Sequence, residues 1–267
     1  MAVWAVLVVL FNVPETDDWL DPKTPPVKPV PENLANATLY ATLYQQQAAE
    51  YKALCFQAYN IASLRLHEEL ALKKTKPLAV VVDIDETVLD NSPYQAASII
   101  GTFNYPVQWS EWMQIASAEA VPGAQEFLSE AALNKVEVFY VTNRKEEFKH
   151  VTIRNLIEKN FPFADSVHVM TRITSNDKEA RRQQVLSKYE IVLFVGDNLG
   201  DFNSIFDETD ASVRTAQTVE NKIEFGKRWI VLPNACYGTW LNALPGYSNK
   251  ISADSLMIVL KSNLKGF

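Results

Sequence analysis

The chain has 267 residues, of which 48% are hydrophobic and 21% charged, so it is long enough for one large domain and too apolar for extensive disorder. Its formal net charge is -7, and because an acidic surface repels phosphate backbones, we do not expect it to bind a nucleic-acid polymer. A small anionic substrate is still compatible with this charge, since a metal ion and a few lysines can reverse the potential locally.

Residues 1–13 are almost all apolar. A run of this length is too short to span a bilayer, which takes about 20 residues, and it is typical of the hydrophobic part of an export signal. The alternative is a buried first strand or helix. We favour export to the periplasm or cell surface and leave membrane association through the N-terminus open. Frequent prolines predict an extended arm after this start, so residues 1–35 form an apolar start and an arm.

A helical segment is predicted next, over residues 36–75. Apolar residues recur there at spacings of three, four and eight, which indicates one long amphipathic helix or two, ending near Leu72. Lysines and then Pro77 follow this helix. They support its predicted end, because cations favour a helix C-terminus and proline cannot continue a helix. The residues of the expected buried face are Leu39, Leu43, Tyr51, Leu54, Cys55, Tyr59, Ala62 and Leu66.

Five short apolar runs predict strands that are buried on both faces, as in parallel sheets. They lie at residues 78–83, 136–141, 166–170, 191–195 and 229–232. Helices are predicted at 145–159 and 178–188, and strands that alternate with helices predict an α/β fold, a Rossmann-like parallel sheet flanked by helices. This core would span residues 76–267, with a cap-like insertion at about 92–122.

Polar residues follow several of these runs, where the active site of such a sheet lies. They are Asp83 and Asp85 after the first run, Thr142, Asn143 and Arg144 after the second, Asp197 and Asp201 after the fourth, and Lys178 at the start of the helix before the fourth. Clustered carboxylates repel one another, and a hard divalent cation with oxygen ligands relieves this repulsion, which predicts Mg²⁺. The metal, the lysine, the hydroxyl and the amide would together cradle a phosphoryl group.

Each of these motifs is weak by itself. Asp-x-Asp also occurs as a metal site in sugar-nucleotide transferases, Thr-Asn-Arg could cap a helix, and Gly-Asp-Asn is a turn signal. Their order along the chain, each directly after an apolar run, favours a shared site. Competing templates are missing, because the sequence has no Walker A loop, no G-x-G-x-x-G fingerprint and no G-x-S-x-G elbow.

The cysteines and histidines offer little chemistry. Cys55 and Cys236 form no CxxC pair, which excludes a zinc cluster, and neither has an arginine six residues later, as a cysteine phosphatase requires. Two buried free thiols are favoured over a disulfide. The histidines lie outside the strand-end motifs, and we interpret His168, inside a predicted strand, as a satisfied core residue.

The stretch VDIDETVLDNSPY, residues 82–94, resembles motif one of the haloacid dehalogenase (HAD) superfamily and, more narrowly, its class C acid phosphatases. The likeness covers roughly residues 37–247 and continues through the segments 121–124, 139–145, 192–199 and 232–240. The resemblance implies a HAD-like fold and a Mg²⁺-dependent phosphomonoesterase. It also implies an exported bacterial enzyme.

The resemblance assigns roles to the four aspartates. Asp83 would be the nucleophile that forms an aspartyl-phosphate, and one of its oxygens would bind Mg²⁺. Asp85 would protonate the leaving group and then take a proton from the hydrolytic water, while its backbone carbonyl binds the metal. Asp197 would be a metal ligand, and Asp201 would hold the water ligands of the metal.

The resemblance also assigns substrate contacts. Thr142, Asn143 and Lys178 would hold the phosphate. Aromatic side chains would clasp a nucleoside or other ring of the substrate, which favours nucleoside 5′-monophosphates or nicotinamide mononucleotide. These aromatic residues are Trp109, Tyr237 and Trp240. Trp112, at helical spacing from the first of them, is interpreted as packing.

Three other functions remain as alternatives. The first is a surface binding protein that keeps the fold without turnover. The second is a phospho-accepting signalling domain on a similar sheet, and the third is a D-x-D glycosyltransferase. A homodimer is compatible with the sequence.

Overall fold

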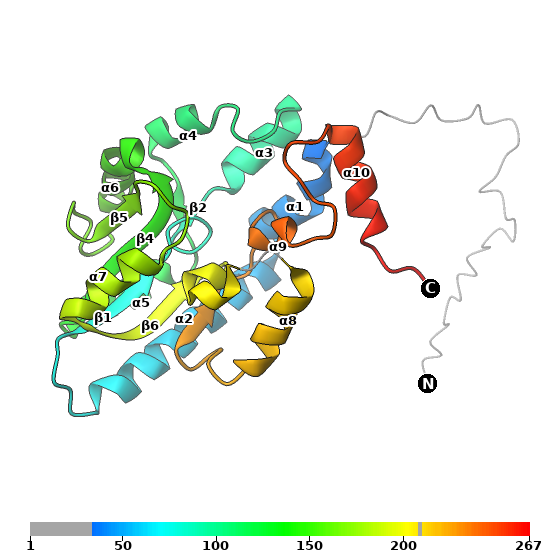
Figure 1. Ribbon diagram of the computed structural model, residues 1–267. Coiled ribbons are helices and arrows are strands. Elements are labelled where there is room, and N and C mark those ends of the chain that lie inside the picture. Colours follow the sequence, from blue (N-terminus) through cyan, green and yellow to red (C-terminus); the bar gives the residue numbers. More distant parts are fainter. Residues whose placement is uncertain (1–33, 208–209) are drawn as a thin grey trace, which may run out of the picture. The chain divides into compact units, whose positions relative to one another are not determined.

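The structure, a computed structural model, describes residues 34–207 and 210–267, and these form a five-stranded parallel sheet with helices on both faces (Figure 1). The strand order is β5-β4-β1-β6-β7. The bounds are β1 Leu78–Val82, β4 Glu137–Lys145, β5 Val169–Arg172, β6 Glu190–Gly196 and β7 Trp229–Val231. The predicted α/β fold with a parallel sheet is confirmed. The apolar start and most of the predicted arm lie outside the described residues.

The third strand differs from its prediction, because β5 begins at Val169 and not at Ser166. The side chain of Asp165 accepts hydrogen bonds from the backbone N–H groups of Val167 and His168, at 2.8 and 3.0 Å, and so holds the residues before the strand in a turn. His168 therefore precedes the strand. Its ring lies 2.9 Å from Asp165 and 3.0 Å from Glu137, so it is satisfied as predicted.

The second strand runs further than predicted. It continues through Thr142, Asn143 and Arg144 to Lys145, so the alternative in which these residues cap a helix is wrong. A short 3₁₀ helix, η3 (Glu146–Phe148), separates the strand from the following helix, α6 (Lys149–Glu158). The predicted helix at 145–159 is thus shorter at its start.

The two faces of the sheet pack against different helices. In β1, Leu78, Val80 and Val82 join the cluster that also contains residues of α2 (Ala49–Leu70), α5 (Ala124–Leu133) and α6. Ala79 and Val81 face the other side, where α7 (Glu179–Lys188) packs. Because every residue of β1 is buried, this strand lies at the centre of the core and its carboxyl end is held rigidly.

The N-terminal helical segment consists of η2 (Leu34–Thr38), α1 (Leu39–Gln47) and α2, with a break at Ala48, whose ψ is 129°. Along α2 most of the predicted face is buried, in particular Tyr51, Cys55, Tyr59, Ala62 and Leu66. Three predicted members are exposed, namely Leu39, Leu43 and Leu54. The break at Ala48 changes the course of the chain, and in α1 Thr42 and Gln45 are the buried residues instead.

Between β1 and β4 the chain forms β2 (Leu89–Asp90), α3 (Ser92–Gly101), α4 (Trp109–Ile115) and β3 (Glu119–Ala120). The two short strands pair with each other in antiparallel fashion and not with the main sheet. Met113 and Ala116 pack against Phe148 and Val151, which places α4 over the start of α6. The insertion thus lies near the carboxyl ends of the strands, and its status as a cap remains a prediction.

The C-terminal part contains η4 (Leu199–Asp201), η5 (Ser204–Phe206), α8 (Ala211–Glu220), α9 (Thr239–Asn242) and α10 (Ala253–Ser262). Cys55 and Cys236 are both buried and unpaired, as favoured from the sequence. Among residues 34–207 and 210–267, no helix is both long enough and apolar enough to cross a membrane.

Candidate active site

The central strand ends in a buried aspartate. Asp83, 7% exposed, is fixed by its backbone N–H, which donates to the carbonyl of Val195 on β6 at 2.9 Å. Lys178, at the start of α7, donates from Nζ to Asp83 Oδ1 and, at 2.7 Å, to Asp201 Oδ1. Burial raises the pKa of Asp83 to about 7, although Lys178 acts in the opposite direction. The sheet thus holds a carboxyl group with a cation beside it.

Two more aspartates follow the neighbouring strand β6. A Cβ atom at Gly196 would lie 2.4 Å from Asp201 Oδ2, so only glycine lets this carboxylate approach the strand end. Asp201 Oδ2 also accepts the N–H of Asn198 at 2.9 Å. Asp197 accepts hydrogen bonds from Asn234 Nδ2 at 2.7 Å and from Thr87 Oγ1 at 3.3 Å. Asp201 is therefore fixed within its own loop, whereas the partners of Asp197 come from the loops after β1 and β7.

These three aspartates fit a divalent metal ion. Asp83, Asp197 and Asp201 each offer a carboxylate oxygen, and the three oxygens lie within 4.8 Å of one another. Burial, followed by the charges of Asp201 and Asp83, raises the pKa of Asp197 well above its ordinary value. A buried group of acids with all-oxygen donors is the environment that a hard cation stabilises. Asp85 does not belong to this carboxylate cluster, and its predicted metal contact is the backbone carbonyl.

The side chain of Asp85 is turned toward Arg144. Arg144 donates from Nε and Nη2 to Asp85 Oδ1 at 2.9 and 2.7 Å, and its own side chain is 2% exposed. Asn91 Nδ2 donates to the same oxygen at 2.8 Å. Sequence reasoning did not identify these two partners. The signal for Arg144 was its place directly after two predicted phosphate ligands, whereas Asn91 had no comparable signal.

Thr142 and Asn143 lie at the end of β4, beside Asp85. Thr142 is fully buried, and its hydroxyl lies 3.5 Å from Asp85 Oδ2 and accepts the N–H of Arg144 at 3.1 Å. Asn143 Oδ1 accepts a hydrogen bond from Arg181 at 2.7 Å. Arg181 is a further residue that the sequence analysis missed, although it lies one helical turn after Lys178. A hydrogen bond thus connects the end of β4 to the first turn of α7.

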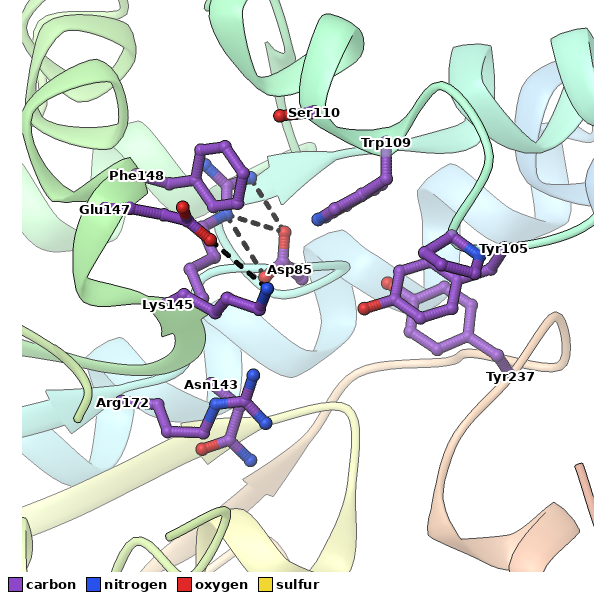
Figure 2. Close-up of a pocket in the computed structure, with 12 residues that line it drawn as sticks. Asp85, Tyr105, Trp109, Ser110, Asn143, Lys145, Glu147, Phe148, Arg172 and Tyr237 are labelled. Atoms are coloured by element: carbon purple, nitrogen blue, oxygen red, sulfur yellow. Dashed lines mark hydrogen bonds and ion pairs between the residues drawn. The ribbon is translucent and has the colours of Figure 1, made fainter. Parts of the chain in front are cut away.

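A cavity of about 400 Å³ opens beside Asp85. Figure 2 shows Trp109, Tyr105 and Tyr237 on one side of Asp85, with Phe148, Lys145, Asn143 and Arg172 on the other. The aromatic residues that line the cavity are Tyr105, Trp109, Phe148 and Tyr237. The rings of Tyr105 and Trp109 meet edge to face at 5.8 Å.

The three predicted clasp residues are placed differently. Trp109 and Tyr237 line the cavity, which places both beside Asp85. Trp240 lies outside the lining residues, and its Nε1 donates to the carbonyl oxygen of Tyr237 at 3.2 Å. Trp112 packs against the core, as predicted, and also donates from Nε1 to Asn91 Oδ1 at 2.8 Å.

Another buried acid, Glu86, lies in the loop after β1, and its side chain contacts Tyr237, which forms an aromatic wall of the cavity with Tyr105 and Trp109. It is 1% exposed and has a φ of 61°. Burial raises its pKa to about 8, with the charge of Asp90 acting in the same direction, whereas hydrogen bonds from Gln45 and Tyr237 lower it. The sequence analysis assigned no role to Glu86.

Comparison with known proteins agrees with this site. The chain belongs to the HAD superfamily, subfamily IIIB, the acid phosphatases, whose family model matches residues 21–240. Its structure is similar to that of the class C acid phosphatase from Bacillus anthracis, with a TM-score of 0.86 and 38% identity over 88% of this chain and 100% of that chain. The same enzyme with tungstate bound gives a TM-score of 0.85 at the same identity and coverage.

A shorter similarity links the chain to a plant protein. Acid phosphatase 1 from Solanum lycopersicum is 29% identical over 82 residues, which are 30% of this chain and 32% of that protein. The match thus spans about a third of that curated relative. Together the comparisons confirm the resemblance seen in the sequence, the HAD-like α/β fold and the class of enzyme, a phosphomonoesterase.

Proposed function

We propose that the protein is a Mg²⁺-dependent acid phosphatase that hydrolyses phosphomonoesters through an aspartyl-phosphate on Asp83. The observation that carries this proposal is the group formed by Asp83, Lys178, Asp197 and Asp201 at the adjoining ends of β1 and β6. A buried carboxylate beside a lysine and two further acids is costly to remove from water, and groups of this kind cluster at functional sites. It is well suited to attack on phosphorus.

Each residue of this group has a defined task. Asp83 attacks the phosphorus atom, and Lys178, Thr142 and Asn143 hold the phosphoryl oxygens during the transfer. Asp83 and Asp197, with Asp201 nearby, would hold Mg²⁺, which would supply positive charge to those oxygens. Because these side chains are fixed before substrate arrives, little reorganisation is needed at the moment of reaction.

Asp85 serves as general acid and then as general base. It lines the cavity, where the leaving group must lie, and it protonates the oxygen that departs from phosphorus. It then takes a proton from the water that hydrolyses the aspartyl-phosphate. Arg144 and Asn91 orient its carboxyl group, and Asp85 has to be released from this ion pair when it carries the proton.

The organic part of the substrate would lie against the aromatic wall. Tyr105, Trp109 and Tyr237 offer ring faces and edges beside Asp85, which suits a nucleoside 5′-monophosphate or nicotinamide mononucleotide. Trp240 would support the wall through Tyr237. Tungstate is a tetrahedral oxyanion like phosphate, so the relative with tungstate bound supports an oxyanion site in this fold.

The proposal is tested by phosphate release from p-nitrophenyl phosphate at about pH 5, in the carboxylate range. We expect turnover that EDTA abolishes and added Mg²⁺ restores. A folded protein that binds nucleotides but releases no phosphate would instead favour the alternative of a binding protein without turnover.

Export to the periplasm or cell surface remains a proposal, as do membrane association through the N-terminus and a homodimer. The support for export is the apolar run at residues 1–13. Cell fractionation of the producing organism tests the location, and recovery of the protein in the cytosolic fraction alone would contradict it.

A further inference from the structure

Glu86 connects three segments that lie far apart in the sequence. Its Oε1 accepts the hydroxyl hydrogen of Tyr237 at 2.9 Å, across 151 positions. Its Oε2 accepts Gln45 Nε2 of α1 at 2.6 Å, across 41 positions, and the N–H of Asn91 at 3.3 Å. All three contacts are buried or partly buried, so water competes weakly with them. The aromatic wall is thereby tied to the loop after β1 and to α1.

The backbone at Glu86 shows that its position is strongly determined. Its φ of 61° lies in the left-handed region, which is unfavourable for a residue other than glycine. The side chain is also buried without a salt bridge to a lysine or arginine among the described residues. A buried acid of this kind is expected where its hydrogen bonds serve a purpose that an apolar side chain could not serve.

The other polar contacts of Tyr237 within the described residues are made by its backbone and not by its ring. Its backbone N–H donates to Asn234 Oδ1 at a long 3.4 Å, and its carbonyl accepts from the half-exposed Trp240. The hydroxyl bond to Glu86 is therefore the contact that fixes the ring where it lines the cavity. This bond persists in either protonation state of Glu86, since a phenol oxygen can also accept a hydrogen bond.

We propose that Glu86 is a positioning residue for specificity, whose carboxyl group holds Tyr237 as the wall for substrates with a large ring. The inference rests on the proposed function, because it takes Tyr237 to face the organic part of the substrate. Glu86 itself touches no reacting atom in this account. Its loss is therefore expected to lower the preference for nucleotides over small alkyl phosphates.

Selectivity is the measurement that tests this proposal. The ratio of kcat/KM for adenosine 5′-monophosphate to that for glycerol 2-phosphate is compared in the wild type, Glu86→Leu and Tyr237→Phe. We expect either substitution to lower this ratio about fivefold to tenfold, since each removes the same hydrogen bond, and their double variant to be no worse than the single ones. Glu86→Gln replaces the carboxyl group with an amide, which can bond both partners. Its selectivity ratio is expected to stay within about twofold of the wild-type ratio.

A matched control removes another buried tyrosine hydroxyl. Tyr140 of β4 donates to the carbonyl of Pro162 at 2.7 Å and does not line the cavity, so Tyr140→Phe is expected to leave the selectivity ratio unchanged. A ratio that stays at the wild-type value in Tyr237→Phe overturns the proposal, and Tyr237→Phe decides alone if Glu86→Leu does not fold. Losses of kcat/KM in the Glu86 and Tyr237 variants that are equal for both substrates also overturn the proposal. A wild-type protein without phosphatase activity would contradict the proposed function itself, which is a separate outcome.

Discussion

The two halves of the active site differ in how they are held. The charged half, with Asp83, Lys178 and Asp201, is less than a tenth exposed, and its side chains pair with one another. In the aromatic half, Tyr105 is 67% exposed and Trp109 half-buried. A buried, mutually paired group can be set for one reaction, whereas a more open wall can accept rings of several shapes. We therefore expect substitutions in the first half to change kcat and those in the second to change KM.

The largest effect is expected at the proposed nucleophile, Asp83. Asp83→Asn keeps the size of the side chain but removes its ability to form an acyl phosphate, so kcat should fall at least about ten-thousandfold. Stopped assays with a chromogenic phosphomonoester measure this, and circular dichroism checks the fold. Asp254→Asn, an exposed change on α10, is the control and should match the wild type. Comparable activity in both variants would be incompatible with an Asp83 nucleophile.

Removing the arginine that orients Asp85 should have the next largest effect. Arg144→Lys keeps a cation but loses the two-pronged contact to the carboxylate, and we expect kcat to fall roughly tenfold to a hundredfold with a smaller change in KM. Arg154→Lys, an exposed change on α6, serves as the control. The distinction between the two halves fails if Arg144→Lys changes KM more than kcat.

Metal binding should stabilise the charged half in a pH-dependent way. Because the pKa values of Asp83 and Asp197 are raised, the metal-free folded protein keeps protons that the unfolded chain has released, and its stability falls as pH rises from about 4 to 7. A metal ion binds the deprotonated acids, so the Tm gain with Mg²⁺ should be larger at pH 7 than at pH 5. At a hundredfold excess over Kd the gain corresponds to about 2.7 kcal/mol.

Differential scanning fluorimetry with EDTA or Mg²⁺ at the two pH values measures this gain. Asp197→Asn removes one of the carboxyl groups with a raised pKa and should therefore make the Tm gain depend less on pH. A Tm gain that is larger at pH 5 than at pH 7 would show that the cluster does not bind the metal as carboxylates.

The smallest effect is expected in the aromatic half. Trp109→Ala removes a ring that lines the cavity and should raise the KM for a nucleoside monophosphate about tenfold, which is of the order of one stacking contact, while kcat changes little. Trp240→Ala should have a weaker effect, because Trp240 reaches the cavity only through Tyr237. Steady-state kinetics on both variants separates the two, and an equal or larger effect of Trp240→Ala would place Trp240 in the wall.

The same division explains what the sequence could predict. Asp83, Thr142 and Asp197 follow continuous apolar runs in the sequence, and parallel topology brings the ends of such runs together, so local pattern was sufficient for the charged half. The fold followed from the alternation of strands and helices for the same reason. The start of β5 was misplaced because a side chain, Asp165, sets it and not hydrophobicity.

The partners of the site could not be predicted in this way. Gln45 meets Glu86 because α1 packs beside α3 of the insertion, and such a long-range contact leaves no periodic signal in the sequence. Asn91 reaches Asp85 and Glu86 across an irregular loop, which has no periodic signal either. The exposed positions Leu39 and Leu43 show the same limit, since the break at Ala48 depends on how α1 packs. The aromatic half was located by resemblance, and the resemblance did not distinguish Tyr237 from Trp240.

Direct detection of the phosphorylated enzyme is the decisive measurement. The protein is mixed with substrate, quenched in acid during turnover, digested and analysed by mass spectrometry. We predict that the peptide containing Asp83 carries one additional HPO₃ group, which disappears when substrate is exhausted. A phosphoryl group on any other residue, or turnover with no phosphorylated peptide at any quench time, would contradict the account.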